Sequence, residues 1–184
     1  ESNNDWQHDL LIVRYANGNF YVRYLQDGGV GANLNFNPAF NQNQWHHFAF
    51  VRNNNYASVY IDGIKQTPRN VGGSTDEMSQ STEVLNSTLY LFKFWDSTYT
   101  GITGSMASLR ISKKAVYTGN FTAPTPELST TQPSGTNIQS LVHSDVVLLV
   151  KADPLGNNNV INESQHSVTI TEDAGITTTL NQQI

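Results

Sequence analysis

Apolar and polar residues alternate with a period of two along much of the first two thirds of the chain. Successive side chains of a β-strand point to opposite faces of its sheet, so this period predicts half-buried strands. The clearest signal is a hairpin whose strands cover 9–15 (DLLIVRY) and 20–25 (FYVRYL). Between them, Asn17-Gly18 is typical of a two-residue type I′ turn. A short third strand is expected at 32–36.

A second group of strands is predicted between Trp45 and Thr67. Its segments are, in order, strand 45–52 (WHHFAFVR), an all-Asn turn at 53–55, strand 57–61 (ASVYI), the turn Asp62-Gly63 and strand 64–67. This spacing predicts a three-stranded meander. Both faces of 45–52 are largely apolar, so we expect this strand to be central and covered on both sides. His46 and His47 then point to opposite faces.

The rest of the chain alternates short strands with polar segments. Further strands are predicted at 89–95, 106–111, 146–150 and 167–171, a long polar loop at 68–87 and one helical turn at 113–117. No segment keeps a period of 3.6 residues, so the sequence predicts an all-β fold. Pro, Thr and Ser dominate an extended linker. The expected division is a β-sandwich at 1–121, the linker at 122–140, and a C-terminal β-arm or the start of a further repeat at 141–184.

Composition removes several classes of function. Asn, Gln, Ser and Thr together supply 66 of the 184 residues, whereas charged residues reach only 14% and the net charge is −5. Ten dispersed Lys and Arg residues provide no basic patch, which argues against a nucleic-acid partner. The longest apolar run is far shorter than the about 20 residues of a membrane-spanning helix. Without cysteine there is no disulfide, no thiolate metal site and no cysteine nucleophile.

Candidate catalytic and metal-binding groups are sparse. Hydrolysis on a β-sandwich usually needs two carboxylates across a cleft, and no closely spaced E-x-D-x-E arrangement occurs, so we expect no enzyme activity and no catalytic residue. The five histidines are scattered, and His46 is interpreted as a core residue bonded to backbone. Calcium is the one cofactor left open, with Asp62 and Asp96 as weak ligands. For Asp62 we favour a turn-forming role, with its carboxylate bonded to its own backbone.

Aromatic residues at loops are the remaining functional candidates. Sugars bind by laying an apolar C–H face on an aromatic ring while amides and carboxylates bond the hydroxyls. Trp95, Asp96, Tyr99 and Asn55 are at or near predicted loops and form the candidate carbohydrate site. The alternative for Trp95 is that it ends a core strand and simply packs there.

Two motifs resemble those of the concanavalin A-like, laminin-G-like jelly-roll domains. In that family a strand W-H-H-x-A-x-x-R precedes x-x-Y-x-D-G, and the matching positions are Trp45, His46, His47, Ala49, Arg52, Tyr60, Asp62 and Gly63. A closing strand and tail are matched by Gly104, Met106, Leu109 to Ser112, and 117–125 (YTGNFTAPT). The tail is most similar to versions in bacteriophage tail fibres and other virion surface proteins. Ala107 and Ser108 depart from the family, which commonly has an acidic residue there.

The resemblance implies an antiparallel jelly-roll β-sandwich that lacks its N-terminal strands. Because those strands should precede Asp9, and because the chain opens on Glu1, we expect a piece of a longer protein. Segments 146–150 and 167–171 look like the opening pair of such a domain. The pair could start a further repeat, could fold back onto its own sheet, or could add to a neighbouring copy. An open sheet edge is an aggregation hazard, so we expect the incomplete sandwich to be closed by some strand.

The implied function is a non-enzymatic module on a virion surface, in a tail fibre or as capsid decoration. Its expected partners are other virion proteins or copies of itself through strand addition, together with cell-surface glycans; nucleic acid and membrane are not expected. The alternative is an extracellular carbohydrate-binding module of a cellular adhesin or of a polysaccharide-degrading enzyme.

Overall fold

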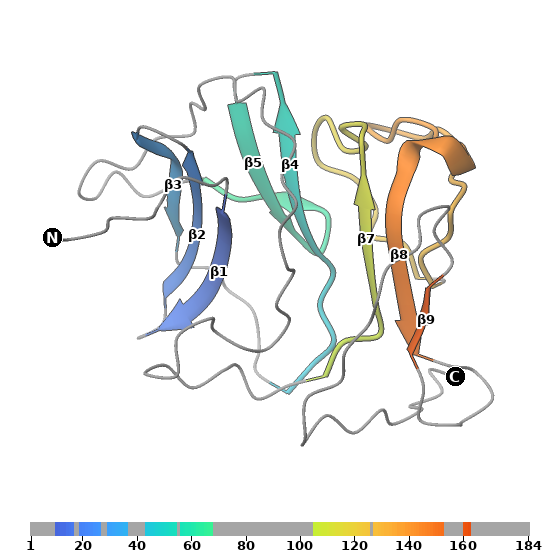
Figure 1. Ribbon diagram of the computed structural model, residues 1–184, viewed down its shortest axis with the longest axis horizontal. Helices are drawn as coiled ribbons and strands as arrows, with labels where there is room; N and C mark the ends of the chain where they lie inside the picture. Colours follow the sequence, from blue (N-terminus) through green and yellow to red (C-terminus); the bar gives the residue numbers. More distant parts are fainter. Residues whose placement is uncertain are drawn as a thin grey trace, which may run out of the picture. The chain divides into compact units, whose positions relative to one another are not determined.

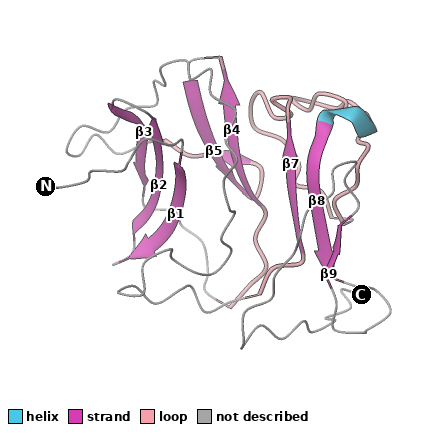
Figure 2. Cartoon of the chain, in the orientation of Figure 1, coloured by secondary structure: helices cyan, strands magenta, loops and turns pink. Residues whose placement is uncertain are grey.

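A computed structural model describes residues 10–16, 19–26, 29–36, 43–54, 56–67, 105–125, 127–152 and 160–162. The regular elements in these ranges are nine β-strands and one 3₁₀ turn (Figures 1 and 2). All strand pairs are antiparallel, which confirms the predicted all-β class. The chain forms two compact units, the N-terminal unit Glu1–Gly104 and the C-terminal unit Ser105–Ile184. Within the described ranges, no helix has the length and apolar composition needed to cross a bilayer.

The first sheet is a meander of β1 (Leu10–Ala16), β2 (Asn19–Gln26) and β3 (Gly29–Phe36). Ala16 pairs with Asn19, so β1 and β2 are joined by the two residues at which the turn was predicted. The hairpin is therefore confirmed. β3 begins earlier than predicted because Gln26 pairs with Gly29, which extends the ladder to the end of β2.

The second sheet has the order β4 (Phe48–Asn53), β5 (Tyr56–Ile61) and β6 (Ile64–Lys65), as the predicted meander requires. The prediction that the first of these strands is central stays a prediction, since any further neighbour of β4 lies outside the described residues. β5 lies in the middle of the three and is covered on both faces, since Val59 and Tyr60 point to opposite faces and both are buried. In β4, by contrast, Phe48 is exposed.

β4 also starts three residues later than predicted. The backbone carbonyl of His47 still accepts a hydrogen bond from the Asp62 N–H at 2.8 Å. The N–H of His47, however, donates to the Asp62 side chain at 2.9 Å. Because a carboxylate replaces the backbone acceptor that a strand would supply, the ladder ends here and 45–47 lie outside it.

The third sheet belongs to the C-terminal unit and has the order β7 (Ser108–Ser112), β8 (Val146–Ala152) and β9 (Val160–Asn162). β7 and β8 match the predicted strands within two residues at each end, whereas β9 was not predicted. β8 supplies four buried residues, namely Val146, Leu148, Leu149 and Val150. Of the three predicted roles for this strand, pairing with β7 of its own chain corresponds to folding back onto its own sheet.

The segment between β7 and β8 contains the range predicted as a Pro/Thr/Ser-rich linker. It folds back on itself, with isolated bridges that join Tyr117 to Ile138 and Gln132 to Leu141. Side chains of the sheet also hold it, because Arg110 donates to the Ser129 carbonyl at 3.0 Å. The described residues 122–125 and 127–140 belong to the C-terminal unit. The predicted three-part division of the chain stays a prediction.

The helical turn predicted at 113–117 was wrong. Its backbone groups bond to distant residues in place of each other: Lys113 N–H donates to the Asp145 carbonyl and the Val116 carbonyl accepts from Gln139 N–H, both at 2.8 Å. The first of these bonds joins the residue after β7 to the 3₁₀ turn His143–Asp145 that precedes β8 (cyan in Figure 2). Long-range pairing has replaced the local i to i+4 bonds that a helix needs.

The tail motif YTGNFT contributes two buried aromatic rings to this folded segment. The rings of Tyr117 and Phe121 are both buried and stack with centroids 3.8 Å apart. Gly119 lies between them in the chain, and a Cβ there would meet the Asn137 side chain at 2.9 Å. The Asn137 amide in turn donates to the Asn120 carbonyl at 2.6 Å. Close backbone approach explains why glycine occupies this position.

Four predicted segments lie outside the described residues. They are the polar loop 68–87, the strand 89–95, the strand 167–171 and the missing N-terminal strands of the sandwich.

The buried strand β8 provides a test of this architecture. Leu149 has no exposed surface, and we expect Leu149→Ala to lower the free energy of unfolding by about 2–5 kcal/mol, through lost burial and the cavity left behind. Ile111 of β7 is 41% exposed, and Ile111→Ala is the matched control, with an expected loss of no more than about 1 kcal/mol. Urea unfolding measures both. Equal losses would contradict the placement of β8 as the buried strand of the C-terminal unit.

Candidate functional site

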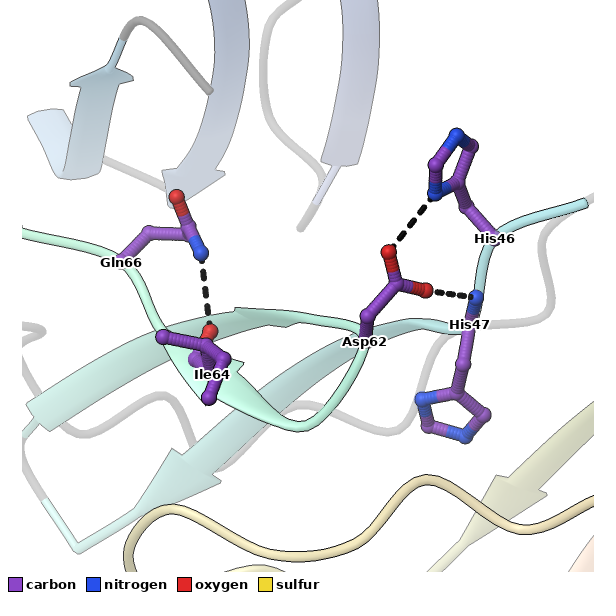
Figure 3. Close-up of polar contacts among 5 residues, drawn as sticks. All are labelled: His46, His47, Asp62, Ile64 and Gln66. Carbon is purple, nitrogen blue, oxygen red and sulfur yellow. Dashed lines mark hydrogen bonds and ion pairs between the residues drawn. The ribbon is translucent and has the colours of Figure 1, made fainter. Parts of the chain in front are cut away.

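Asp62 joins the two ends of the family motif. Its carboxylate accepts a hydrogen bond from His46 Nδ1 at 2.7 Å and a second from His47 N–H at 2.9 Å (Figure 3). The rings of His46 and His47 lie on opposite sides of the chain, as predicted. The prediction that His46 is a core residue bonded to backbone was wrong, since its partner is a carboxylate. We name this set of residues (His46, His47 and Asp62) the carboxylate clamp.

Backbone geometry aims the Asp62 carboxylate at its partners. Asp62 and Gly63 form the two-residue turn between β5 and β6, with Ile61 paired to Ile64. Both turn residues are left-handed, with φ of 52° for Asp62 and 80° for Gly63, as a type I′ turn requires. Asp tolerates this conformation better than most residues. The turn-forming role of Asp62 is confirmed, but its carboxylate bonds residues 15 and 16 positions away and not its own turn.

The carboxylate clamp keeps Asp62 ionised. Burial raises the pKa of its carboxyl, but the hydrogen bonds from His46 and from the His47 N–H, with the charge of the nearby imidazoles, outweigh burial. The pKa therefore lies below its ordinary value of 3.8. Because 49% of the Asp62 side chain is exposed, solvent screens these interactions and limits their energy.

Neither weak calcium ligand receives support from the described residues. Both carboxylate oxygens of Asp62 already accept hydrogen bonds, and Asp96 lies outside the described residues. In the ranges that the structure describes, no group of three or more His, Asp or Glu side chains is arranged to hold a metal ion.

The opposite end of the β4–β5 hairpin is a polar tip with an exposed aromatic ring. Asn53 and Tyr56 are directly paired, so their side chains point to the same face about 5 Å apart at Cβ. Both are exposed, Tyr56 to 54%. Between them, Asn54 is left-handed with φ of 53°, and its carbonyl accepts a 3.4 Å hydrogen bond from Arg52 Nε. We name residues 53–56 the hairpin tip.

A second exposed aromatic residue adjoins the carboxylate clamp. Trp45 is 45% exposed and directly precedes His46. The second sheet therefore presents a large ring near each end of its first hairpin. In both places polar side chains follow within a few residues, a combination that can contact a sugar through its C–H face and its hydroxyls.

The largest polar cluster of the C-terminal unit has a structural role. The Arg110 guanidinium donates to the Ser129 carbonyl at 3.0 Å and to Gln132 Oε1 at 2.7 Å. Burial lowers the pKa of Arg110, and burial likewise raises the pKa of Tyr117, to which Arg110 is also hydrogen bonded. These bonds fasten the segment 127–132 to β7 and leave the guanidinium engaged with its own chain.

Of the predicted carbohydrate site, the structure describes only residues next to Asn55. Asn55, Trp95, Asp96 and Tyr99 all lie outside the described residues, and they stay predictions. Asn55 nevertheless belongs to the hairpin tip, whose neighbouring residues are described. The sequence pattern did not single out Trp45, because alternation assigns it to a strand, or Tyr56, which falls between the predicted turn at 53–55 and the predicted strand at 57–61. The signal that could have found Tyr56 is its position directly after three asparagines, where a strand end is exposed.

Comparison with known proteins gives one family. The concanavalin A-like lectin/glucanases superfamily matches residues 1–118. This range covers the first two sheets and also β7, so the match continues into the C-terminal unit. No curated protein and no solved structure matches the chain.

The lowered pKa of Asp62 gives a prediction with a defined sign. A carboxyl with a lowered pKa stabilises the fold above its ordinary pKa, and this contribution is lost as the pH falls through the lowered value. We expect Asp62→Asn to cost about 1 kcal/mol at pH 7, the value for a hydrogen bond to a charged group reduced for exposure. In urea unfolding the difference from wild type should shrink below about pH 4.

The control for this test is Glu127→Gln. Glu127 pairs with Lys151 at 3.7 Å and is more than half exposed, so its loss should change stability little at either pH. A cost for Asp62→Asn that stayed constant from pH 7 down to pH 2 would contradict the ionised clamp.

Proposed function

This chain belongs to the concanavalin A-like lectin/glucanases superfamily, and we propose that it is a non-enzymatic adhesion module that binds host glycans on a virus particle. The family by itself indicates a carbohydrate-binding or adhesion-type module. The observation that carries the proposal further is the exposure of aromatic rings beside polar side chains, Tyr56 at the hairpin tip and Trp45 by the carboxylate clamp. Such rings are suited to the weak, repeated contacts by which a multivalent particle holds a cell surface.

The use of the described carboxylates supports a role without catalysis. Three acidic side chains fall in the described ranges, and each has a structural contact. Asp62 bonds His46 and His47, Glu127 pairs with Lys151, and Asp145 accepts a hydrogen bond from the Val142 N–H at 3.1 Å. Glycoside hydrolysis needs two carboxylates that face one sugar, one of them as proton donor. The described residues favour binding over that chemistry.

The virion setting is supported by the closing motif of the domain. YTGNFTAPT at 117–125 is similar to tails of bacteriophage fibre and virion surface domains. In this chain the motif forms a buried aromatic layer with stacked Tyr117 and Phe121. A surface that is polar with few charges also suits a protein exposed on a particle. We propose a tail-fibre or capsid-decoration module, with other virion proteins or further copies of the chain as its structural partners.

Glycan binding is tested on an array of host cell-surface glycans. We expect the intact chain to bind a subset of them and to leave each glycan unshortened after prolonged incubation, as judged by mass spectrometry. Trp95→Ala and Tyr99→Ala test the earlier candidate site, where loss of binding is the expected result. Shortened products would show an enzyme, and an array without any bound glycan would refute the adhesive function.

The virion setting is tested by electron microscopy of the native particle with antibodies against this chain. We expect label on tail fibres or on the capsid surface. Label on a cell surface or on a secreted polysaccharide-degrading enzyme, with none on particles, would favour the cellular alternative.

A further inference from the structure

Building on the proposed function, we propose that the hairpin tip is a glycan-contact element, in addition to the earlier candidates Trp95 and Tyr99, and that it takes neutral hexopyranose units. The proposal assigns the ring of Tyr56 to the apolar face of the sugar and the amide of Asn53 to its hydroxyls. It also brings the earlier candidate Asn55 into the same element.

The pairing of Asn53 with Tyr56 supplies the geometry. Directly opposed residues of an antiparallel pair share a face, so the amide stands beside the edge of the phenol ring. A pyranose that lies flat on the ring would bring its equatorial hydroxyls to the ring edge. An Asn amide both donates and accepts hydrogen bonds, as vicinal hydroxyls do. One ring and one amide therefore meet the two needs of a sugar, an apolar face and a bidentate polar partner.

The charge around the hairpin tip selects the class of sugar. On the Tyr56 face, the other described positions of β4 and β5 carry no charge: they are Ala49, Val51, Asn53, Ser58 and Tyr60. Arg52 lies on the opposite face, and its Nε donates to the Asn54 carbonyl. Lys65 shares the Tyr56 face but is paired with Tyr60, roughly 13 Å along the strand from Tyr56. Among the described residues no cation lies beside the ring, so a sialic acid or a sulfated sugar would find no ion-pair partner in this part of the chain.

The hairpin tip is held ready before any ligand binds. Asn54 adopts its left-handed conformation in a two-residue connection, and the Arg52 bond braces its carbonyl. Behind the tip, Val51 and Ala57 are buried and anchor both strands. A braced turn loses little conformational freedom on binding, so a small contact area can still give measurable affinity.

Trp45 is the natural competitor for this role. Its exposure is similar to that of Tyr56, but the polar groups next to it are those of the carboxylate clamp. His46 and Asp62 already bond each other at 2.7 Å, so a sugar there would have to compete with an existing interaction. At the hairpin tip, the Asn53 and Tyr56 side chains are both exposed and face solvent.

The experiment compares single variants of the full chain on an array of neutral glycans ending in glucose, galactose, mannose or N-acetylhexosamine, with sialylated and sulfated counterparts. The best neutral glycan is then titrated by calorimetry. Tyr56→Thr, which keeps the strand propensity, should weaken binding about tenfold. Tyr56→Phe should retain most of the affinity, and Asn53→Asp should weaken binding by removing the amide donor. Ile64→Ala, which removes an exposed apolar side chain beside the Asp62-Gly63 turn, should bind as the wild type does.

The outcomes separate this inference from the function on which it rests. Unfolding curves that match the wild type establish that each variant is folded. If the wild type binds and Trp45→Ala loses binding while Tyr56→Thr keeps it, the hairpin tip is overturned and the adhesive function stands. A preference for sialylated or sulfated glycans would overturn the neutral class. If the wild type binds no glycan at all, the proposed function itself fails.

Discussion

The contact on which the second sheet depends is the one between the Asp62 carboxylate and the His46-His47 pair. One oxygen takes the His46 side chain and the other takes the His47 backbone N–H, while the Asp62 N–H returns to the His47 carbonyl. These three bonds end the β4–β5 ladder at one side and fix the turn into β6. They also explain why the motif has a histidine at position 46 and Asp-Gly after the partner strand: these residues are distant in sequence and adjacent in the fold.

In the C-terminal unit, too, hydrogen bonds between residues distant in sequence position the strands. β8 carries the buried residues, but it is positioned by a connection that looks in sequence like a spacer. Arg110 reaches from β7 to Ser129 and Gln132, and Lys113 and Asp145 close the two strands at one end. A polar composition does not prevent a segment from being ordered when buried aromatic rings such as Tyr117 and Phe121 anchor it. The C-terminal unit therefore includes residues beyond the 118 that match the family.

The carboxylate clamp and the hairpin tip lie at opposite ends of the β4–β5 hairpin and use different side chains. At the carboxylate clamp, both carboxylate oxygens of Asp62 already accept hydrogen bonds from His46 and His47. The same bonds end the β4–β5 ladder. At the hairpin tip, Arg52 braces the Asn54 carbonyl from the other face, so the ring and amide proposed for recognition are not the side chains that stabilise the turn. This separation suits an adhesive module, whose surface can vary while its fold is kept.

The sequence by itself determined the all-β class, both hairpins, the Asp62-Gly63 turn and the family, because these follow from local alternation, turn residues and a specific motif. It also brought attention to the asparagines of the hairpin tip through Asn55. Only the tertiary structure decided that β5 lies between β4 and β6, that His46 pairs with Asp62, and that Ser129 and Gln132 bond to β7. It alone revealed Tyr56 as exposed. Each of these depends on which distant segment supplies a hydrogen-bond partner or covers a face, and a period of two describes only a strand's own alternation.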